Sequence, residues 1–241
     1  MQNNELIKYL RMATDNYGLK IDEALLSQFD LYYRLLVEWN EKINLTAITD
    51  PEGVAVKHFA DSLAFFEYIS DIPECASLID IGTGAGFPGV VIKLIRPDIR
   101  LTLLDSLKKR FLFLKELTSR LGIEAEFVQG RAEELGQDLD YRESFDFVVS
   151  RAVARLNVLS EYCLPFARLS GRFIAFKGGD FEQELDEARK AVQILGGKFD
   201  KAQSFELPLG GGSRSLIVIE KIQPTPEKYP RVNGRIKAKP L

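Results

Sequence analysis

The sequence predicts a doubly wound α/β fold, with a mostly parallel seven-stranded sheet, an antiparallel last strand and an N-terminal helical extension. From residue 76 onward, short apolar runs alternate with helical stretches, which favours a parallel sheet covered on both faces. The last two apolar runs are separated only by PLGGGSR, so they must pair antiparallel. Before residue 70, apolar residues recur three or four positions apart, as on one face of a helix.

The extension should contain two main helices. One spans LLSQFDLYYRLLVEWNEKI (25–43), and the segment NLTAITDPEG then interrupts the helical pattern. Asp50 followed by Pro51 is typical of a helix start, and we expect this second helix to continue through His58 to Tyr68.

The sheet region follows in order along the chain. Its expected strands are SLIDI, RLTLLD, EAEFVQ, FDFVVS, RFIAFK and the runs near 198–206 and 215–221. Its expected helices are 86–95, 108–121, 131–136, 156–169 and 181–195. We therefore divide the chain into an N-terminal helical cap (1–70), an α/β domain (71–222) and a basic C-terminal tail (223–241).

Composition excludes several classes of protein. A hydrophobic share of 46% and a charged share of 28% indicate a soluble globular chain, and no apolar run is long enough to span a membrane. Two cysteines and one histidine offer no metal-ligand spacing and no disulfide framework. The N-terminus lacks the pattern of a secretory signal. We expect a cytoplasmic monomer without a metal.

The strongest motif is the glycine-rich segment LIDIGTGAGFPG (78–89), which follows a strand and precedes a helix. Gly82 and Gly84 let the chain turn sharply and let a ligand approach the backbone. The ligand could be a pyrophosphate or the carboxylate of a methionine, because the following helix favours negative charge. Asp80 before the loop and Phe87 in place of the last dinucleotide-motif glycine favour S-adenosylmethionine. A plain glycine-rich turn remains the alternative.

Two later positions fit the same ligand. Asp105 ends the second strand and could accept both hydroxyls of a ribose, although it or Ser106 could instead cap the next helix. After the third strand, in QGRAEEL, the backbone of Ala132 and the carboxylate of Glu133 are placed to meet an adenine edge. Glu133 could otherwise be an ordinary acid in the first turn of a helix.

Several phrases together resemble one known family, the bacterial small-subunit rRNA methyltransferase G or glucose-inhibited division protein B family. They are NLTAITDPEGVAVKHFADSL, DIGTGAGFPG, LLDSLKKRFLFL, QGRAEEL, VVSRAVARLNVL, FIAFKGG and RSLIVIEK, in order from Asn44 to the C-terminus. The resemblance implies a class I, Rossmann-like methyltransferase that methylates a guanine at ring nitrogen 7 in 16S rRNA, near the decoding centre. It implies cofactor contacts at Gly82, Phe87, Ala132, Glu133 and Arg151. Ala85 stands where many members have proline, which should affect only loop stiffness.

The chemistry agrees with this acceptor. Nitrogen 7 carries a free lone pair and no proton, so in-line methyl transfer needs alignment and charge stabilisation but no general base. The chain has no N/D-P-P-Y segment and no Pro-Cys nucleophile. No catalytic residue is evident; Arg151 and His58 are the candidates, and a structural role is the simpler interpretation of a single histidine. We expect His58, Asp61 and Ser62 to share a helix face that closes over the cofactor.

The charge distribution suggests where RNA binds. Residues 221–241 hold six lysines and arginines and one glutamate, a local charge of +5 in a chain of net charge −3. We expect a mobile tail that orders on phosphates, so deleting 228–241 should weaken rRNA binding and leave cofactor binding intact. Candidate RNA contacts are Arg155, Lys177, Arg214, Lys228, Arg231, Arg235, Lys237 and Lys239.

Three rival interpretations remain open at this point. The tail could be a solubilising segment. The chain could be a non-catalytic RNA-binding or assembly module, for 16S rRNA or the small ribosomal subunit, that keeps a cofactor pocket. An NAD-dependent oxidoreductase is less favoured, because Phe87 and the terminal hairpin argue against it.

Overall fold

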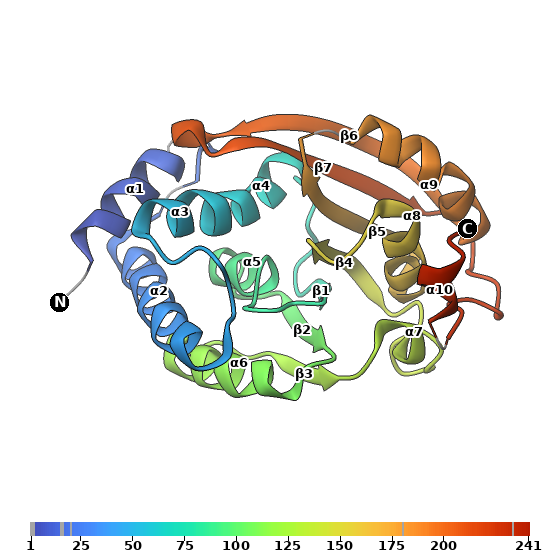
Figure 1. The fold of residues 1–241 in the computed structure, drawn as a ribbon, viewed down its shortest axis with the longest axis horizontal. Coiled ribbons are helices and arrows are strands. Elements are labelled where there is room, and N and C mark those ends of the chain that lie inside the picture. The colour runs from blue at the N-terminus through green and yellow to red at the C-terminus, as the bar shows by residue number, and fades with distance from the viewer. Residues whose placement is uncertain (1–2, 15–16, 20, 180, 233) are drawn as a thin grey trace.

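A seven-stranded sheet of order β3-β2-β1-β4-β5-β7-β6 forms the centre of the computed structural model, which describes residues 3–14, 17–19, 21–179, 181–232 and 234–241 (Figure 1). The strands β1 to β5 are mutually parallel, and β7 runs antiparallel between β5 and β6. The predicted hairpin is therefore confirmed. The strands are β1 (Ser77–Ile81), β2 (Arg100–Asp105), β3 (Glu126–Gln129), β4 (Phe145–Arg151), β5 (Ala167–Gly178), β6 (Gly197–Leu207) and β7 (Gly212–Lys221).

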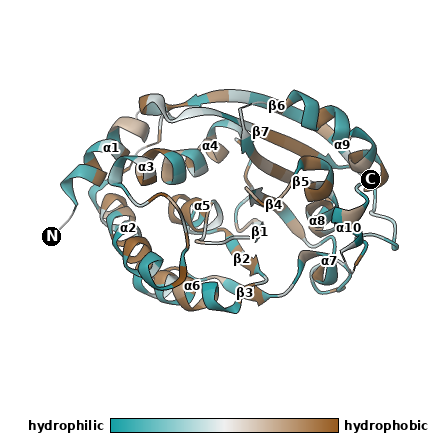
Figure 2. Cartoon of the chain, in the orientation of Figure 1, coloured by the Kyte–Doolittle hydropathy of each residue, from teal (hydrophilic) through white to brown (hydrophobic). Residues whose placement is uncertain are grey.

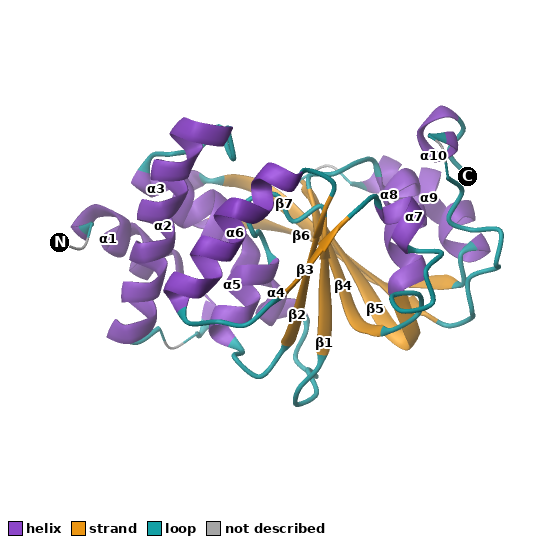
Figure 3. Ribbon diagram, turned by 90° about the horizontal axis from the view of Figure 1, so that it is seen from below, coloured by secondary structure: helices purple, strands orange, loops and turns teal. Residues whose placement is uncertain are grey.

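Helices cover both faces of the sheet, as Figure 3 shows. All five residues of β1 are buried, as a central strand between two helical layers requires. One layer holds α1 (Asn4–Thr14), α2 (Glu23–Ile43), α3 (Pro51–Val54), the π-helix η2 (Ala55–Ala60), α4 (Asp61–Tyr68), α5 (Gly89–Ile95) and α6 (Lys108–Leu121). The other holds α7 (Ala132–Leu135), α8 (Leu156–Cys163), α9 (Glu182–Ile194) and α10 (Arg235–Ala238).

The helices show the apolar and polar faces that the sequence pattern predicted. In Figure 2 the surface helices α6 and α9 are hydrophilic on their outer sides, and hydrophobic residues concentrate in β4, β5 and β7. Asp50 caps the start of α3, where its carboxylate accepts from the Gly53 amide at 2.7 Å and Pro51 occupies the first turn. None of the helices within the described ranges is long and apolar enough to cross a membrane.

The N-terminal helices share one hydrophobic core with the sheet. Phe29 and Tyr32 of α2 and Phe59 of η2 are fully buried in the same cluster as residues of β1 and β4. Tyr32 stacks on Phe87 with ring centroids 5.0 Å apart, and its hydroxyl donates to the Ala85 carbonyl at 2.6 Å. The extension is thus attached directly to the glycine-rich loop.

Two helix boundaries differ from the expectation by three residues or more. The helix predicted over 156–169 ends at Cys163, because a short 3₁₀ turn containing Pro165 follows it and β5 already begins at Ala167. The helix predicted from residue 86 begins at Gly89, because residues 84–88 form turns of the glycine-rich loop. The second shift moves Phe87, a predicted site residue, from the expected helix into the glycine-rich loop.

Candidate active site

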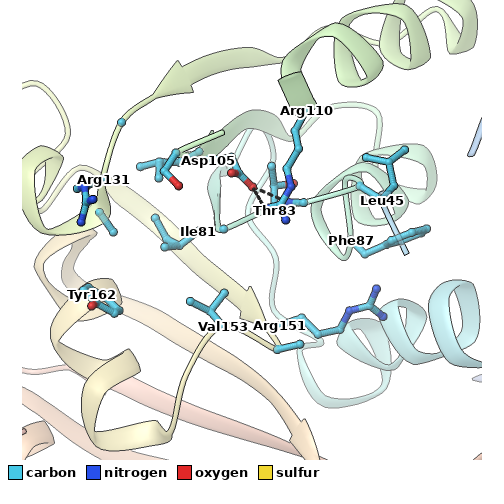
Figure 4. A pocket seen from close by; sticks show the side chains of 18 of the residues that line it. Leu45, Ile81, Thr83, Phe87, Asp105, Arg110, Arg131, Arg151, Val153 and Tyr162 are labelled. Atoms are coloured by element: carbon cyan, nitrogen blue, oxygen red, sulfur yellow. Dashed lines mark hydrogen bonds and ion pairs between the residues drawn. The ribbon is translucent and has the colours of Figure 1, made fainter. Parts of the chain in front are cut away.

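A cavity of about 680 Å³ opens at the carboxyl ends of the parallel strands, where doubly wound sheets bind ligands. In Figure 4, Phe87 and Arg151 lie at one end of the cavity, Tyr162 and Arg131 at the other, and Asp105 between them. The predicted cofactor residues that line it are Gly82, Gly84, Phe87, Asp105, Ala132, Glu133 and Arg151. The sequence prediction therefore brought together residues from four different strand ends.

The glycine-rich loop forms the floor of the cavity. Gly82 has a φ of +72°, and a Cβ added there would lie 2.7 Å from Cγ2 of Val153, so the loop needs glycine for both conformation and space. The Gly82 and Thr83 amides donate to the Leu104 carbonyl at 2.9 and 3.1 Å. This pairing fixes the loop against the end of β2.

Asp80 stands under the loop and does not line the cavity. Its Oδ2 accepts from the Thr83 hydroxyl and the Gly89 amide, both at 2.9 Å. Burial raises the pKa of this carboxyl to about 6. Within the described part of the chain, its Oδ1 is buried without a hydrogen-bond partner. These contacts favour support of the loop by Asp80 over direct contact with a ligand.

Asp105 occupies the middle of the cavity and is only 2% exposed. Its Oδ2 accepts from the Gly84 amide at 3.0 Å and from Arg110 at 2.7 Å, and its Oδ1 accepts from the Leu107 amide at 2.9 Å. The cap residue of α6 is Leu107, and no side chain caps that helix. Asp105 therefore links β2 to the glycine-rich loop. The alternative that Asp105 or Ser106 caps the next helix is wrong.

Sequence reasoning missed several residues that line the cavity. Tyr162 of α8 and Arg110 of α6 line it, as do Gly234 and Lys237 of the C-terminal segment. Lys237 was predicted as an RNA contact, and nothing local in the sequence marks it or Tyr162 as a residue of the cavity. Both reach the cavity through packing between distant segments.

A second cluster closes the opposite end. Nη1 of Arg151 lies 2.8 Å from Oδ2 of Asp61, and the side chains of the two residues are 13% and 5% exposed. The same nitrogen donates to the carbonyls of Lys57 and His58, and the guanidinium carbon lies 4.9 Å from the centre of the Phe87 ring. Arg151 thus joins the end of β4 to the N-terminal helices.

His58 lines the cavity beside this ion pair. Its ring stacks on Phe87 at 4.7 Å, and its Nε2 lies 2.8 Å from the Thr46 hydroxyl. Burial, and next the charge of Arg151, lower the pKa of His58 to about 3, so the ring is neutral at pH 7. Nδ1 lies 3.3 Å from Nη2 of Arg151 and 3.2 Å from the Lys57 carbonyl, so the tautomer of the ring decides which of these two contacts is a hydrogen bond.

The expected shared face of His58, Asp61 and Ser62 is only partly a cavity wall. Asp61 points to Arg151, and the fully buried Ser62 donates to the His58 carbonyl at 2.6 Å. Within the described residues, His58 is the member of the three that lines the cavity. The other two position the helix.

Several predicted RNA contacts are engaged within the protein. Lys177, 12% exposed, pairs with Glu184 at 2.8 Å and donates to the Ala154 carbonyl. Arg155 pairs with Glu187 at 2.7 Å but stays largely exposed. Arg214 is half-buried, with Nε 3.8 Å from Asp61. These pairs reduce what Lys177 in particular can offer to a phosphate.

The expectation of a mobile tail is wrong. Arg231 makes a two-pronged pair with the fully buried Glu161, and Tyr229 and Ile236 belong to the core beside α8. The expectation that deleting 228–241 spares cofactor binding is also not supported, since Gly234 and Lys237 line the cavity. Lys228, Arg235 and Lys239 are exposed. Within the described ranges, no group of three or more potential metal ligands occurs.

Comparisons with known proteins identify a family and agree with the fold. The model of the family "GidB: rRNA small subunit methyltransferase G" matches residues 25–216. Proteins named ribosomal RNA small subunit methyltransferase G are 48% identical in Desulforamulus reducens, over 99% of both chains, and 49% identical in Lactococcus lactis subsp. cremoris, over 97% of this chain and 98% of that one.

Solved methyltransferase structures share the fold. A ribosomal protein L11 methylase from Lactobacillus delbrueckii subsp. bulgaricus superposes with a TM-score of 0.53 at 16% identity, over 69% of this chain and 79% of that one. A precorrin-6y C5,15-methyltransferase from Geobacter metallireducens gives 0.50 at 13% identity, over 67% and 86%. The family match covers most of the chain, and the matched range includes the glycine-rich loop, Asp105 and Arg151. The chain belongs to the rRNA small subunit methyltransferase G family.

Proposed function

We propose that this chain transfers a methyl group from S-adenosylmethionine to ring nitrogen 7 of a guanine in 16S rRNA, in the loop near the decoding centre. Its relatives carry the name of a small-subunit rRNA methyltransferase. The observation that carries the proposal is one continuous cavity, in which a buried carboxylate (Asp105) and a neutral ring (His58) face the same space.

The residues present fit the cofactor. Asp105 offers a buried carboxylate for the ribose hydroxyls, provided that Arg110 gives up its share of Oδ2. Glu133 and the backbone of Ala132, facing Tyr162, suit the adenine. Gly82 leaves room for the ligand to approach the backbone. S-adenosylmethionine supplies an electrophilic methyl group on a positively charged sulfur.

The methionine end of the ligand would then lie near Phe87 and Arg151. A guanidinium carries five N–H donors, so the pair with Asp61 leaves Arg151 donors for a carboxylate. The unpartnered Oδ1 of Asp80, beneath the loop, could accept a bond from the ligand's ammonium through a water. We therefore assign Arg151 to the cofactor rather than to an RNA phosphate.

The residues around the methyl group have to align the guanine with it and to shield both from water. They do not have to remove a proton. Nitrogen 7 attacks with its own lone pair, the carbon–sulfur bond breaks, and the positive charge moves to the purine. With a pKa of about 3, His58 is a poor base at pH 7. It would instead form, with Phe87, the wall against which the guanine is positioned, and Thr46 would hold its ring in place.

RNA would approach the rim of the cavity. Arg155 follows the cavity residue Val153 by two positions, and Arg214 lies 3.8 Å from Asp61, which pairs with the cavity residue Arg151. The exposed cations Lys228, Arg235 and Lys239 would add positive charge along the C-terminal segment. The target guanine should be unpaired and turned out of its stack, because a base within a helix could not enter.

The deciding experiment is methyl transfer from labelled S-adenosylmethionine to deproteinised 16S rRNA and to isolated small subunits, with the product located by mass spectrometry of RNA fragments. We expect one 7-methylguanine per RNA. Binding of S-adenosylhomocysteine and rRNA without transfer would instead identify a non-catalytic assembly module. Membership in a methyltransferase family leaves no support for the NAD-dependent oxidoreductase.

A further inference from the structure

The C-terminal segment, residues 222–241, is built into the protein near the cavity. Arg142 donates to the Tyr229 carbonyl at 2.8 Å and to the Thr225 carbonyl at 2.6 Å. The side-chain amide of Gln137 donates to the Pro230 carbonyl at 3.0 Å. Groups from the loop after α7 thus satisfy the backbone of a segment about ninety residues later.

A buried ion pair anchors the middle of the segment. Glu161 of α8 is 0% exposed, and Arg231 reaches it with Nε at 2.9 Å, with Nη2 at 2.6 Å and with its own backbone amide at 2.8 Å. Removing Arg231 would leave an uncompensated buried carboxylate, which is strongly unfavourable. The segment therefore has one preferred position on α8.

Gly234 and Lys237, beyond Arg231, line the cavity. Gly234 has a φ of +73° and directly precedes α10, whose Ile236 is 1% exposed in the core beside α8. Figures 1 and 3 both place α10 beside α8 and α7. With Ile236 buried, the neighbouring Lys237 and Gly234 are left facing the cavity.

From this geometry we infer that residues 234–241 form a wall over the adenosine part of the cofactor, with Gly234 and Lys237 as its ligand-facing residues. The inference rests on the proposed use of S-adenosylmethionine. Tyr162 and Arg131 lie at the end of the cavity away from Phe87 in Figure 4, and Ala132 and Glu133, which follow Arg131 in the sequence, line the same cavity. The aliphatic stem of Lys237 would cover apolar ligand surface while its ammonium group stays in water.

The test uses the full chain and a variant that ends after Arg231, which keeps the pair with Glu161. Calorimetric titrations with S-adenosylhomocysteine and with 5′-methylthioadenosine, which lacks the amino-acid part, report the adenosine contacts directly. We expect both dissociation constants to rise together, about tenfold. An unchanged dissociation constant for both ligands, or a loss confined to S-adenosylhomocysteine, overturns the inference.

Point variants keep the test decisive if the truncated chain folds poorly. Lys237→Ala should weaken the binding of both ligands about threefold, whereas Lys237→Met should bind them like the original chain because it keeps the aliphatic stem. Lys239→Ala is the control, because it removes the same charge at a residue outside the cavity lining. Equal effects of Lys237→Ala and Lys239→Ala on ligand binding would reject the wall.

The two proposals fail in different ways. If the full chain binds neither ligand, the proposed cofactor and the wall fall together. If it methylates 16S rRNA and the truncated chain binds both ligands as tightly, only the wall falls.

Discussion

The guanidinium of Arg110 lies 2.7 Å from Oδ2 of Asp105, the oxygen that also accepts from the Gly84 amide. A ribose held by Asp105 would have to share or replace this contact. Arg110 is about one-third exposed, whereas Asp105 is buried, so the arginine is the partner that can move. Arg110 would therefore compete with the cofactor's ribose for Asp105.

The first prediction follows from that competition. Arg110→Met should bind S-adenosylhomocysteine about two- to fivefold more tightly, because the pair with Asp105 no longer has to be broken. Asp105→Asn should bind it about tenfold more weakly. Calorimetric titration measures both, and Lys109→Met is the control for loss of a neighbouring charge. Weaker binding by Arg110→Met would mean that the arginine itself contacts the ligand.

The second prediction concerns the pair of Arg151 and Asp61. Arg151→Ala should lower the free energy of unfolding by about 3 kcal/mol, because it leaves the buried Asp61 carboxylate without its main partner. Adding Asp61→Ala should recover part of that loss. Urea unfolding of the four proteins of the cycle gives the coupling. Arg189→Ala, at an exposed pair with Asp186, should change stability by less than about 0.5 kcal/mol.

Additive effects of the two substitutions would contradict this account. They would show that Asp61 does not depend on Arg151, and the neighbouring Arg214, 3.8 Å from Asp61, would be the partner to examine next. Reduced activity in these variants would then have to be attributed to contacts with ligand or RNA.

The third prediction is a pH dependence specific to His58. Its pKa in the folded protein, about 3, is below the ordinary value of 6.5, so the unfolded chain binds the extra proton between these values. The stabilisation due to the neutral ring is complete above pH 6.5 and is lost as the pH falls toward 3. The stability difference between the original chain and His58→Gln should therefore narrow from pH 7 to pH 5.

Urea unfolding at several pH values measures that difference, and groups common to both proteins cancel in it. A difference that stays constant would show that His58 titrates normally. The same variant should keep a flat pH profile for methyl transfer between pH 6.5 and 8, as the proposed transfer without a base requires.

The sequence predicted those parts of the site that depend on local patterns. The strand ends, the glycine-rich loop and Asp105 could be placed because parallel strands bring their carboxyl ends to one edge. It could not predict pairings between distant positions. Arg151 meets Asp61 across 90 residues, and Arg231 meets Glu161 across 70.

The error about the tail has the same physical origin. A segment rich in proline, glycine and positive charge resembles a disordered one when it is considered alone. Its order comes from Glu161, Arg142 and Gln137, which belong to other elements and satisfy its charge and its backbone. Tyr162 and Lys237 enter the cavity through the same packing, so composition alone could not reveal them.

The last prediction separates cations that bind RNA from those that hold the fold. Lys228, Arg235 and Lys239 are exposed, so their joint replacement by alanine should weaken binding of 16S rRNA. The slope of log affinity against log salt should become shallower by about 0.7 to 0.9 for each RNA phosphate that the variant no longer neutralises. Filter binding at several salt concentrations measures this.

Two variants make that result interpretable. Lys8→Ala, on α1 in the opposite helical layer, removes a charge far from the C-terminal segment and should leave the slope unchanged. Arg231→Ala should instead lower the urea midpoint, because its guanidinium is engaged by the buried Glu161. The prediction is wrong if the triple variant keeps the original slope while Arg155→Ala or Arg214→Ala reduces it. In that case the RNA lies along β7 and the start of α8, and the positive charge of the C-terminal segment serves another purpose.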